Sequence, residues 1–123
     1  MRIFEGASWG RKVNFVDKNN VLVGYDMDQC CCENADWYIL DRIESDTSLS
    51  GSVEESLEDY NFDPNFFQDV DGDYNSGGMV VFKLINEKNG DEKYLHLFNI
   101  HNGYYGHGFQ LSIDNKIIQD GCL

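Results

Sequence analysis

The sequence predicts an α+β fold, in which an antiparallel β-sheet of about six strands carries a short helix. Short runs that alternate apolar and polar residues, each bounded by turn residues, indicate the strands. A carboxylate ahead of a partly apolar segment near residue 28 indicates the helix. A length of 123 residues and a hydrophobic content of 41% fit a single domain over residues 1–123.

Residues 11–17 and 21–25 predict a first β-hairpin. They are joined by Lys18-Asn19-Asn20, and asparagine tolerates the left-handed backbone conformation that a tight turn needs. Val13 and Phe15 alternate with polar neighbours, so we expect them to face a core.

A helix of about two turns, packed on this hairpin, is predicted to follow Asp28 within residues 28–40. Asp28 is a suitable N-cap, because its carboxylate can accept from the free backbone N–H groups of a first turn. Helical spacing would then place Cys30, Asn34 and Trp37 on one face.

The middle of the chain predicts an irregular, acidic, partly helical excursion at about residues 44–78. Residues 43–82 include no lysine or arginine, and residues 45–52 are rich in Ser, Thr and Gly. Residues 53–60 fit a short helix, and Asp63-Pro64 fits the start of a helical turn. That turn carries Phe66 and Phe67, which we expect to anchor the excursion to the domain.

The β pattern returns after residue 78. Residues 79–85 and 94–100 read as two long strands joined through Asn89-Gly90, and the second is apolar on both faces, which predicts a central strand covered on two sides. Residues 109–113 alternate, Asp114-Asn115 turns the chain, and residues 116–119 close the sheet.

The charge of the chain restricts its partners. Twenty-two acidic against nine basic side chains give a net charge of −13, which would repel nucleic acids and anionic membranes and favours a basic protein surface as partner. No signal peptide or membrane span is recognisable, and the clustered cysteines do not resemble a disulfide framework, so we expect the host-cell cytoplasm. The partner-binding candidates are Glu54, Glu55, Glu58, Asp59, Asp69, Asp71 and Asp73.

Residues 101–109 have the composition of a binding loop, with glycines, histidines and aromatic residues close together. Tyrosine rings there can stack on a base or a sugar, and the backbone N–H groups of the glycines can donate hydrogen bonds to a phosphate. The alternative is a glycine-rich turn whose aromatic side chains complete the core. The ligand-binding candidates are His101, Asn102, Tyr104, Tyr105 and His107.

Metal and cysteine chemistry are weaker alternatives. Cys31, Cys32, His101 and His107 are suitable zinc ligands, but no C-x-x-C pair is present, and small buried cysteines packing the core explain the pattern better. Residues 69–75 resemble the first half of a calcium loop, yet Tyr74 stands where such a loop needs glycine. No cofactor is predicted, zinc and calcium stay open, and no motif supports an enzyme.

Two stretches carry a resemblance. They are Val13-Asn14-Phe15-Val16-Asp17 continuing through Gly24-Tyr25-Asp26 into Gln29-Cys30-Cys31-Cys32-Glu33, and residues 97–109. Together they resemble a family of small phage and bacterial domains of unknown function. The resemblance implies a phage or mobile-element accessory gene and brings no catalytic residue with it.

We therefore expect a non-enzymatic binding protein of phage or mobile-element origin that acts on a host protein through an acidic surface. The most specific version of this hypothesis is that the protein inhibits a host defence enzyme by occupying the basic nucleic-acid channel of that enzyme. The alternatives are an acidic surface that serves solubility, a small-ligand or nucleotide binder using residues 101–109, and a metal-binding domain.

Overall fold

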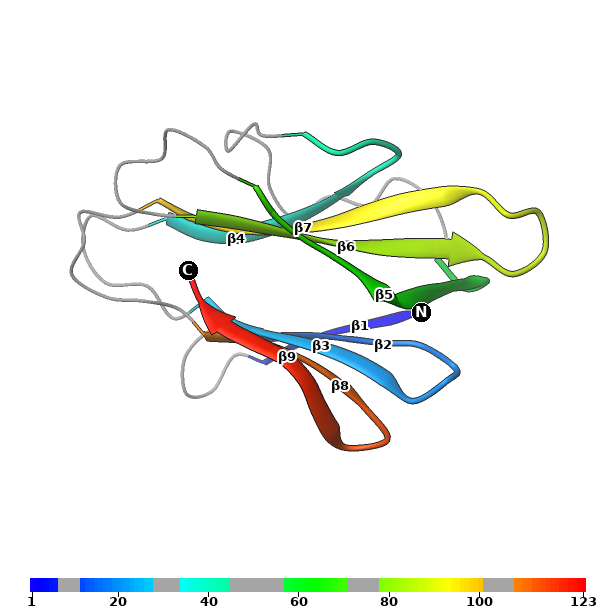
Figure 1. The fold of residues 1–123 in the computed structure, drawn as a ribbon, viewed down its shortest axis with the longest axis horizontal. Helices are drawn as coiled ribbons and strands as arrows, with labels where there is room; N and C mark the ends of the chain where they lie inside the picture. The colour runs from blue at the N-terminus through cyan, green and yellow to red at the C-terminus, as the bar shows by residue number, and fades with distance from the viewer. Residues whose placement is uncertain (7–11, 28–33, 45–56, 71–77, 101–107) are drawn as a thin grey trace.

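The computed structural model is an all-β sandwich and describes residues 1–6, 12–27, 34–44, 57–70, 78–100 and 108–123 (Figure 1). Nine strands in these residues form two antiparallel sheets. The first sheet has five strands in the spatial order β1 (Arg2–Gly6), β2 (Lys12–Val16), β3 (Val21–Asp26), β8 (Gly108–Ile113) and β9 (Lys116–Cys122). The second has four, in the order β4 (Asn34–Leu40), β7 (Glu92–Ile100), β6 (Gly78–Asn86) and β5 (Tyr60–Val70).

The predicted α+β class is wrong, because the described residues contain no helix and nine strands replace the expected six. Residues 34–40 form strand β4, in which Trp37 and Ile39 belong to the core between the sheets while Tyr38 lies on the opposite face. A short segment that is apolar on both faces does not distinguish a helix from a strand by its periodicity. This segment is a strand because it pairs with β7, and Trp37 lies opposite Leu97. Asp28 and Cys30 lie outside the described residues.

The prediction of an irregular, partly helical acidic region at about residues 44–78 is also wrong, because residues 60–70 form strand β5. Its register with β6 shifts between Asp63 and Phe67, and Pro64 lies inside this irregularity. Proline is tolerated there because β5 is an edge strand, where a missing N–H need not interrupt a ladder. The two phenylalanines pack as expected: the Phe67 ring stacks on Phe109 with centroids 5.8 Å apart, and the Phe66 ring lies 5.8 Å from Tyr94.

The hairpin predictions are confirmed. β2 pairs with β3, β6 with β7 and β8 with β9. Their turns use the expected left-handed residues, with φ of 60° at Asn20, 78° at Gly90 and 68° at Asn115. β7 is the central strand that its composition predicted, since it lies between β4 and β6. Strand β1 was not predicted, because its five residues show no clear alternation.

The core lies between the sheets, and polar contacts join them at several points. The Asp17 carboxylate accepts from the Val21 N–H at 3.0 Å in its own turn and from the Phe62 N–H of β5 at 2.9 Å. The Tyr25 hydroxyl donates to the Phe98 carbonyl at 2.7 Å. Fully buried residues of both sheets fill the space between them, among them Val13, Phe15, Val23, Ala35, Leu84, Leu95 and Leu97.

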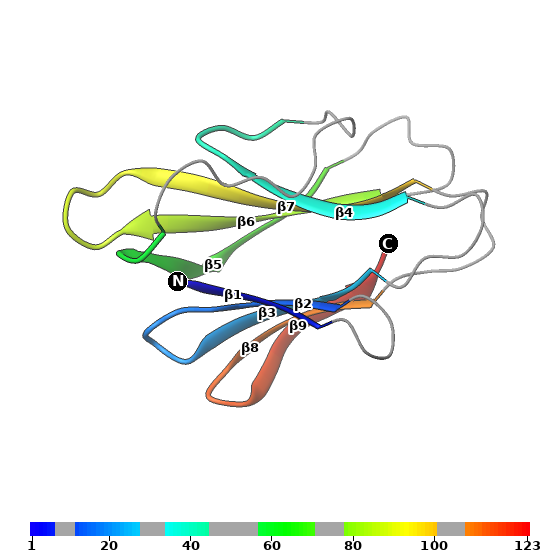
Figure 2. The ribbon, with the colours of Figure 1, turned by 180° about the vertical axis from the view of Figure 1, so that it is seen from behind.

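The two outer faces of the sandwich differ. On the four-stranded sheet, Tyr38 is 1% exposed and Phe98 is 0% exposed, and both pack with Met79 and Val81 in a second apolar cluster. On the five-stranded sheet, Phe4 of β1 is 51% exposed and Ile117 of β9 is 52% exposed. Figure 2 shows that none of the described segments lies over this face.

Among the described residues, no helix has the length and apolar character needed to cross a bilayer.

Candidate functional site: a groove on the five-stranded sheet

Most residues predicted to bind a ligand, metal or partner lie outside the described residues. The strand ends on either side of residues 7–11, 28–33, 71–77 and 101–107 lie at the same end of the two sheets, and the last three of these segments hold predicted residues. There Gly6 pairs with Lys12, Asn34 with Ile100, and Gly78 with Asn99. The predicted residues outside the description are Cys31, Cys32, Glu54, Glu55, Asp71, Asp73, His101, Asn102, Tyr104, Tyr105 and His107.

The predicted partner-binding acids that the structure describes do not form one patch. Asp59 precedes β5 and Asp69 lies near its far end, so the 11-residue strand separates them by roughly 30 Å. The Asp59 carboxylate also lies 3.5 Å from the Lys88 ammonium, which offsets its charge. Glu58 is exposed beside Asp59. The described part therefore divides these acids between the two ends of the sandwich.

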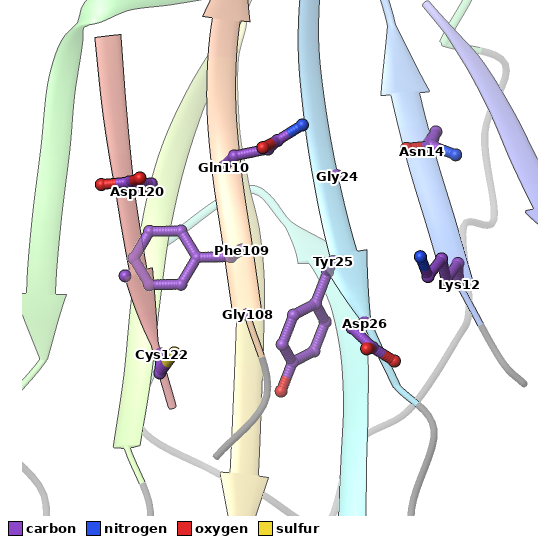
Figure 3. Close-up of a pocket in the computed structure, with 11 residues that line it drawn as sticks. Lys12, Asn14, Gly24, Tyr25, Asp26, Gly108, Phe109, Gln110, Asp120 and Cys122 are labelled. Atoms are coloured by element: carbon purple, nitrogen blue, oxygen red, sulfur yellow. The ribbon is translucent and has the colours of Figure 1, made fainter. Parts of the chain in front are cut away.

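A groove on the five-stranded sheet is the candidate site (Figure 3). It encloses about 490 Å³ near the end of the sheet at which β2 begins and β3 ends. Gly108 and Phe109, the described residues of the predicted binding loop, line it. Its other lining residues are Lys12, Asn14, Gly24, Tyr25, Asp26, Gln110, Asp120, Gly121 and Cys122.

Gly24 lies in one transverse row of the groove lining. Asn14 is opposite Gly24 on β2, and Gln110 is opposite it on β8, so one transverse row carries amide, glycine and amide. Figure 3 shows the two amide side chains on either side of Gly24. A Cβ at this position would lie 2.9 Å from the Asn14 Oδ1 atom and 3.9 Å from the Gln110 Cγ atom. Glycine therefore keeps the space between the two amides open.

Four polar side chains of the groove, those of Lys12, Asn14, Gln110 and Asp120, retain hydrogen-bonding capacity. Within the described part of the chain, the amides of Asn14 and Gln110 make no hydrogen bond, and Lys12 and Asp120 make no ion pair. Each amide offers two donor hydrogens and an acceptor oxygen, the ammonium only donates and the carboxylate only accepts. The groove thus offers both donors and acceptors beside Gly24.

His96, the histidine that the structure describes, instead uses both ring nitrogens in contacts with the backbone. Its Nδ1 contacts the Tyr94 carbonyl at 3.1 Å, and because a carbonyl only accepts, Nδ1 carries the proton. Its Nε2 then accepts from the Glu44 N–H at 3.0 Å, and its ring stacks on Tyr38. Burial lowers the pKa of His96 from 6.5 to about 4. The ring is therefore neutral near neutral pH and serves to hold the segment at Glu44 over the four-stranded sheet.

Metal-ligand side chains do not gather in threes anywhere in the described ranges. Cys122 is exposed at the rim of the groove.

Comparison with known proteins gives no match to this chain, whether with family models, with curated proteins or with solved structures. The resemblance to small phage and bacterial domains therefore remains a prediction.

Sequence reasoning missed Asn14, Gly24 and Gln110 as site residues. One signal was present, because a glycine inside the apolar run of residues 21–25 marks close approach of another group. Asn14 and Gln110 are 96 positions apart in the chain, and only the pairing of β3 with both β2 and β8 brings them to the same glycine.

Proposed function

We propose that this chain is a non-enzymatic binding protein and that it binds through the outer face of its five-stranded sheet. The observation that carries the proposal is the groove that Gly24 lines, in which the two amides beside this glycine have no partner in the described part. A polar side chain that folding leaves unpaired on a concave surface is available to a ligand.

The contrast between the outer faces supports this choice of surface. The four-stranded sheet uses its outer face for packing, with Phe98 and Met79 fully buried. The five-stranded sheet leaves its outer face open and combines half-exposed apolar side chains with polar ones, which is the mixture found at binding surfaces.

Site-specific photo-crosslinking tests the proposal. A photo-crosslinking residue in place of Gln110 should give covalent adducts in cells that express the protein. The same residue in place of Gln68 should not, because Gln68 is an equally exposed glutamine on β5 of the other sheet. Adducts from neither position, or from both equally, would contradict the proposed surface.

A second candidate function is the binding of a basic host protein through acidic surface, as expected for a phage or mobile-element protein that inhibits a defence enzyme. The net charge of −13 favours it, because such a field accelerates encounter with a basic partner.

Salt dependence separates this candidate from the first. If the crosslinker at Gln110 captures a basic protein, that protein can be purified and its association rate with this chain measured. The rate should fall steeply between low and physiological ionic strength. An association rate that does not change with salt would exclude the electrostatic version.

A further inference from the structure

The charge and polarity of the groove identify the class of ligand that fits it. Among the described residues that line it, the charged side chains are one cation, Lys12, and two anions, Asp26 and Asp120, in a chain whose net charge is −13. The groove is thus close to neutral although the protein is strongly acidic. A phosphate would meet the Asp120 carboxylate and a lysine-rich peptide would meet the Lys12 ammonium, and neither group has an ion pair in the described part, so a neutral ligand fits best.

The hydrogen-bonding groups select among neutral ligands. An apolar ligand would remove water from the amides of Asn14 and Gln110 without replacing their hydrogen bonds, which is unfavourable. A hydroxyl group both donates and accepts, as the two amides do. A ligand with many adjacent hydroxyls can therefore satisfy the amides, the Lys12 ammonium and the Asp120 carboxylate together.

An exposed aromatic ring lies at the end of the same row. Phe4 of β1 is opposite Asn14, so the row across the sheet runs through Phe4, Asn14, Gly24, Gln110 and Asp120. Five strands at the usual spacing span about 19 Å, which is longer than one sugar ring. The Phe4 ring is 51% exposed, and the negative face of an aromatic ring attracts the C–H groups on the apolar side of a pyranose.

We propose that the groove binds a neutral oligosaccharide, an inference that rests on the binding function proposed above. The sugar chain lies across the strands, with one ring on Phe4 and the next residues over Gly24. The Asn14 and Gln110 amides and the Asp120 carboxylate bind its hydroxyls.

Nuclear magnetic resonance titration of the full chain tests this assignment. The probes are maltotetraose, cellotetraose, mannotetraose and chitotetraose, and the signals are the side-chain NH₂ groups. At least one probe should shift the signals of Asn14 and Gln110 while those of Asn65 and Gln68, exposed on β5, stay in place.

Variants then identify the contacts. Asn14→Ala and Gln110→Ala should each lower affinity about tenfold, the usual effect of removing one or two hydrogen bonds. Gly24→Val should abolish binding by filling the space between the two amides, and Phe4→Ala should weaken it through loss of stacking. Gln68→Ala is the matched control and should bind as the unmodified chain does. Equal affinity in Asn14→Ala, Gln110→Ala and the control would overturn the assignment.

The outcomes separate this inference from the function on which it rests. If no oligosaccharide shifts the two amide signals while the crosslinker at Gln110 still gives adducts, the ligand class is wrong and the binding face stands. Shifts produced by a short polylysine or by inositol hexakisphosphate, and by none of the sugars, would likewise overturn the neutral ligand. If the Gln110 crosslinker also gives no adduct, both proposals fail.

Discussion

Phe98 and Phe4 both lie on the outer face of a sheet, Phe98 on the central strand β7 and Phe4 on the edge strand β1, and Phe98 is 0% exposed whereas Phe4 is 51% exposed. On the four-stranded sheet the outer apolar side chains form a second cluster and contribute to stability. On the five-stranded sheet the apolar side chains of Phe4 and Ile117 remain about half exposed. The difference shows that the sandwich packs one of its outer faces and leaves apolar side chains of the other exposed.

Polar groups on the two faces follow the same division. His96 has both ring nitrogens engaged by the backbone of its own chain. The amides of Asn14 and Gln110 have no partner in the part of the chain that the structure describes. A buried polar group must be satisfied within the fold, whereas an exposed one can be paired with water until a ligand replaces it.

The largest expected effect comes from truncating the covered face. Phe98→Ala should lower the free energy of unfolding by about 4 kcal/mol, because it leaves a cavity beside Tyr38 and Met79. Chemical denaturation monitored by fluorescence measures this change. A loss below about 1 kcal/mol would mean that the outer face of the four-stranded sheet is not a packed core in solution.

The next effect is a pH dependence that originates in His96. The imidazolium form is disfavoured in the fold, where the pKa is about 4, but not in the unfolded chain, where it is near 6.5. The unfolded state therefore binds more protons between these values, so this contribution to stability is complete above pH 6.5 and is lost as the pH falls to about 4. The total is on the order of 3 kcal/mol.

His96→Gln provides the comparison, since glutamine can donate and accept but does not titrate in this range. Urea denaturation at a series of pH values should give a shallower decline below pH 6.5 for this variant than for the unmodified chain. Arg42 and Glu44, the charged residues that also affect the pKa of His96, are present in both proteins. Parallel declines would show that His96 is not the group responsible.

A smaller effect is expected at the contact that joins the sheets. Asp17→Asn should cost about 2 kcal/mol, because an amide nitrogen would replace one of the two oxygens that accept from Val21 and Phe62. Thermal unfolding should show a lower midpoint for this variant. Asp91→Asn, at an exposed position in the β6–β7 turn, is the control and should leave the midpoint unchanged.

The smallest effects belong to the open face. Phe4→Ala and Gly24→Ala should each change the free energy of unfolding by about 0.5 kcal/mol or less. Phe4 is already half exposed, and the close neighbour of a Cβ at Gly24 is the mobile end of Asn14. Calorimetry checks both variants. A loss comparable to that of Phe98→Ala would remove the distinction between the two faces.

Local sequence was sufficient to predict the hairpins and the central strand. Asn20, Gly90 and Asn115 adopt the left-handed conformations that their residue types favour, and the alternation of Val13 and Phe15 correctly indicated a core face. Local sequence failed to predict the strands at residues 34–40, which are largely apolar, and at residues 60–70, which carry several acidic residues, because such compositions fit several local conformations. In both cases pairing with a distant strand, β7 or β6, decided the outcome.

The candidate site was predictable only in part. The stretch of residues 101–109 leads into β8, and its described members Gly108 and Phe109 line the groove. Asn14, Gln110 and Asp120 carry no local signal of binding, because polar residues are ordinary on the exposed side of a strand. Their common row across the sheet is a property of the register.

The sequence by itself determined the turns, the acidic charge and the apolar faces of most strands, since these depend on neighbouring residues and on composition. The tertiary structure alone decided that there are two sheets, that the outer face of one is covered, and that two amides face each other across Gly24. The physical reason is that strand pairing and burial are set by contacts between segments far apart in the chain, which local preferences do not specify.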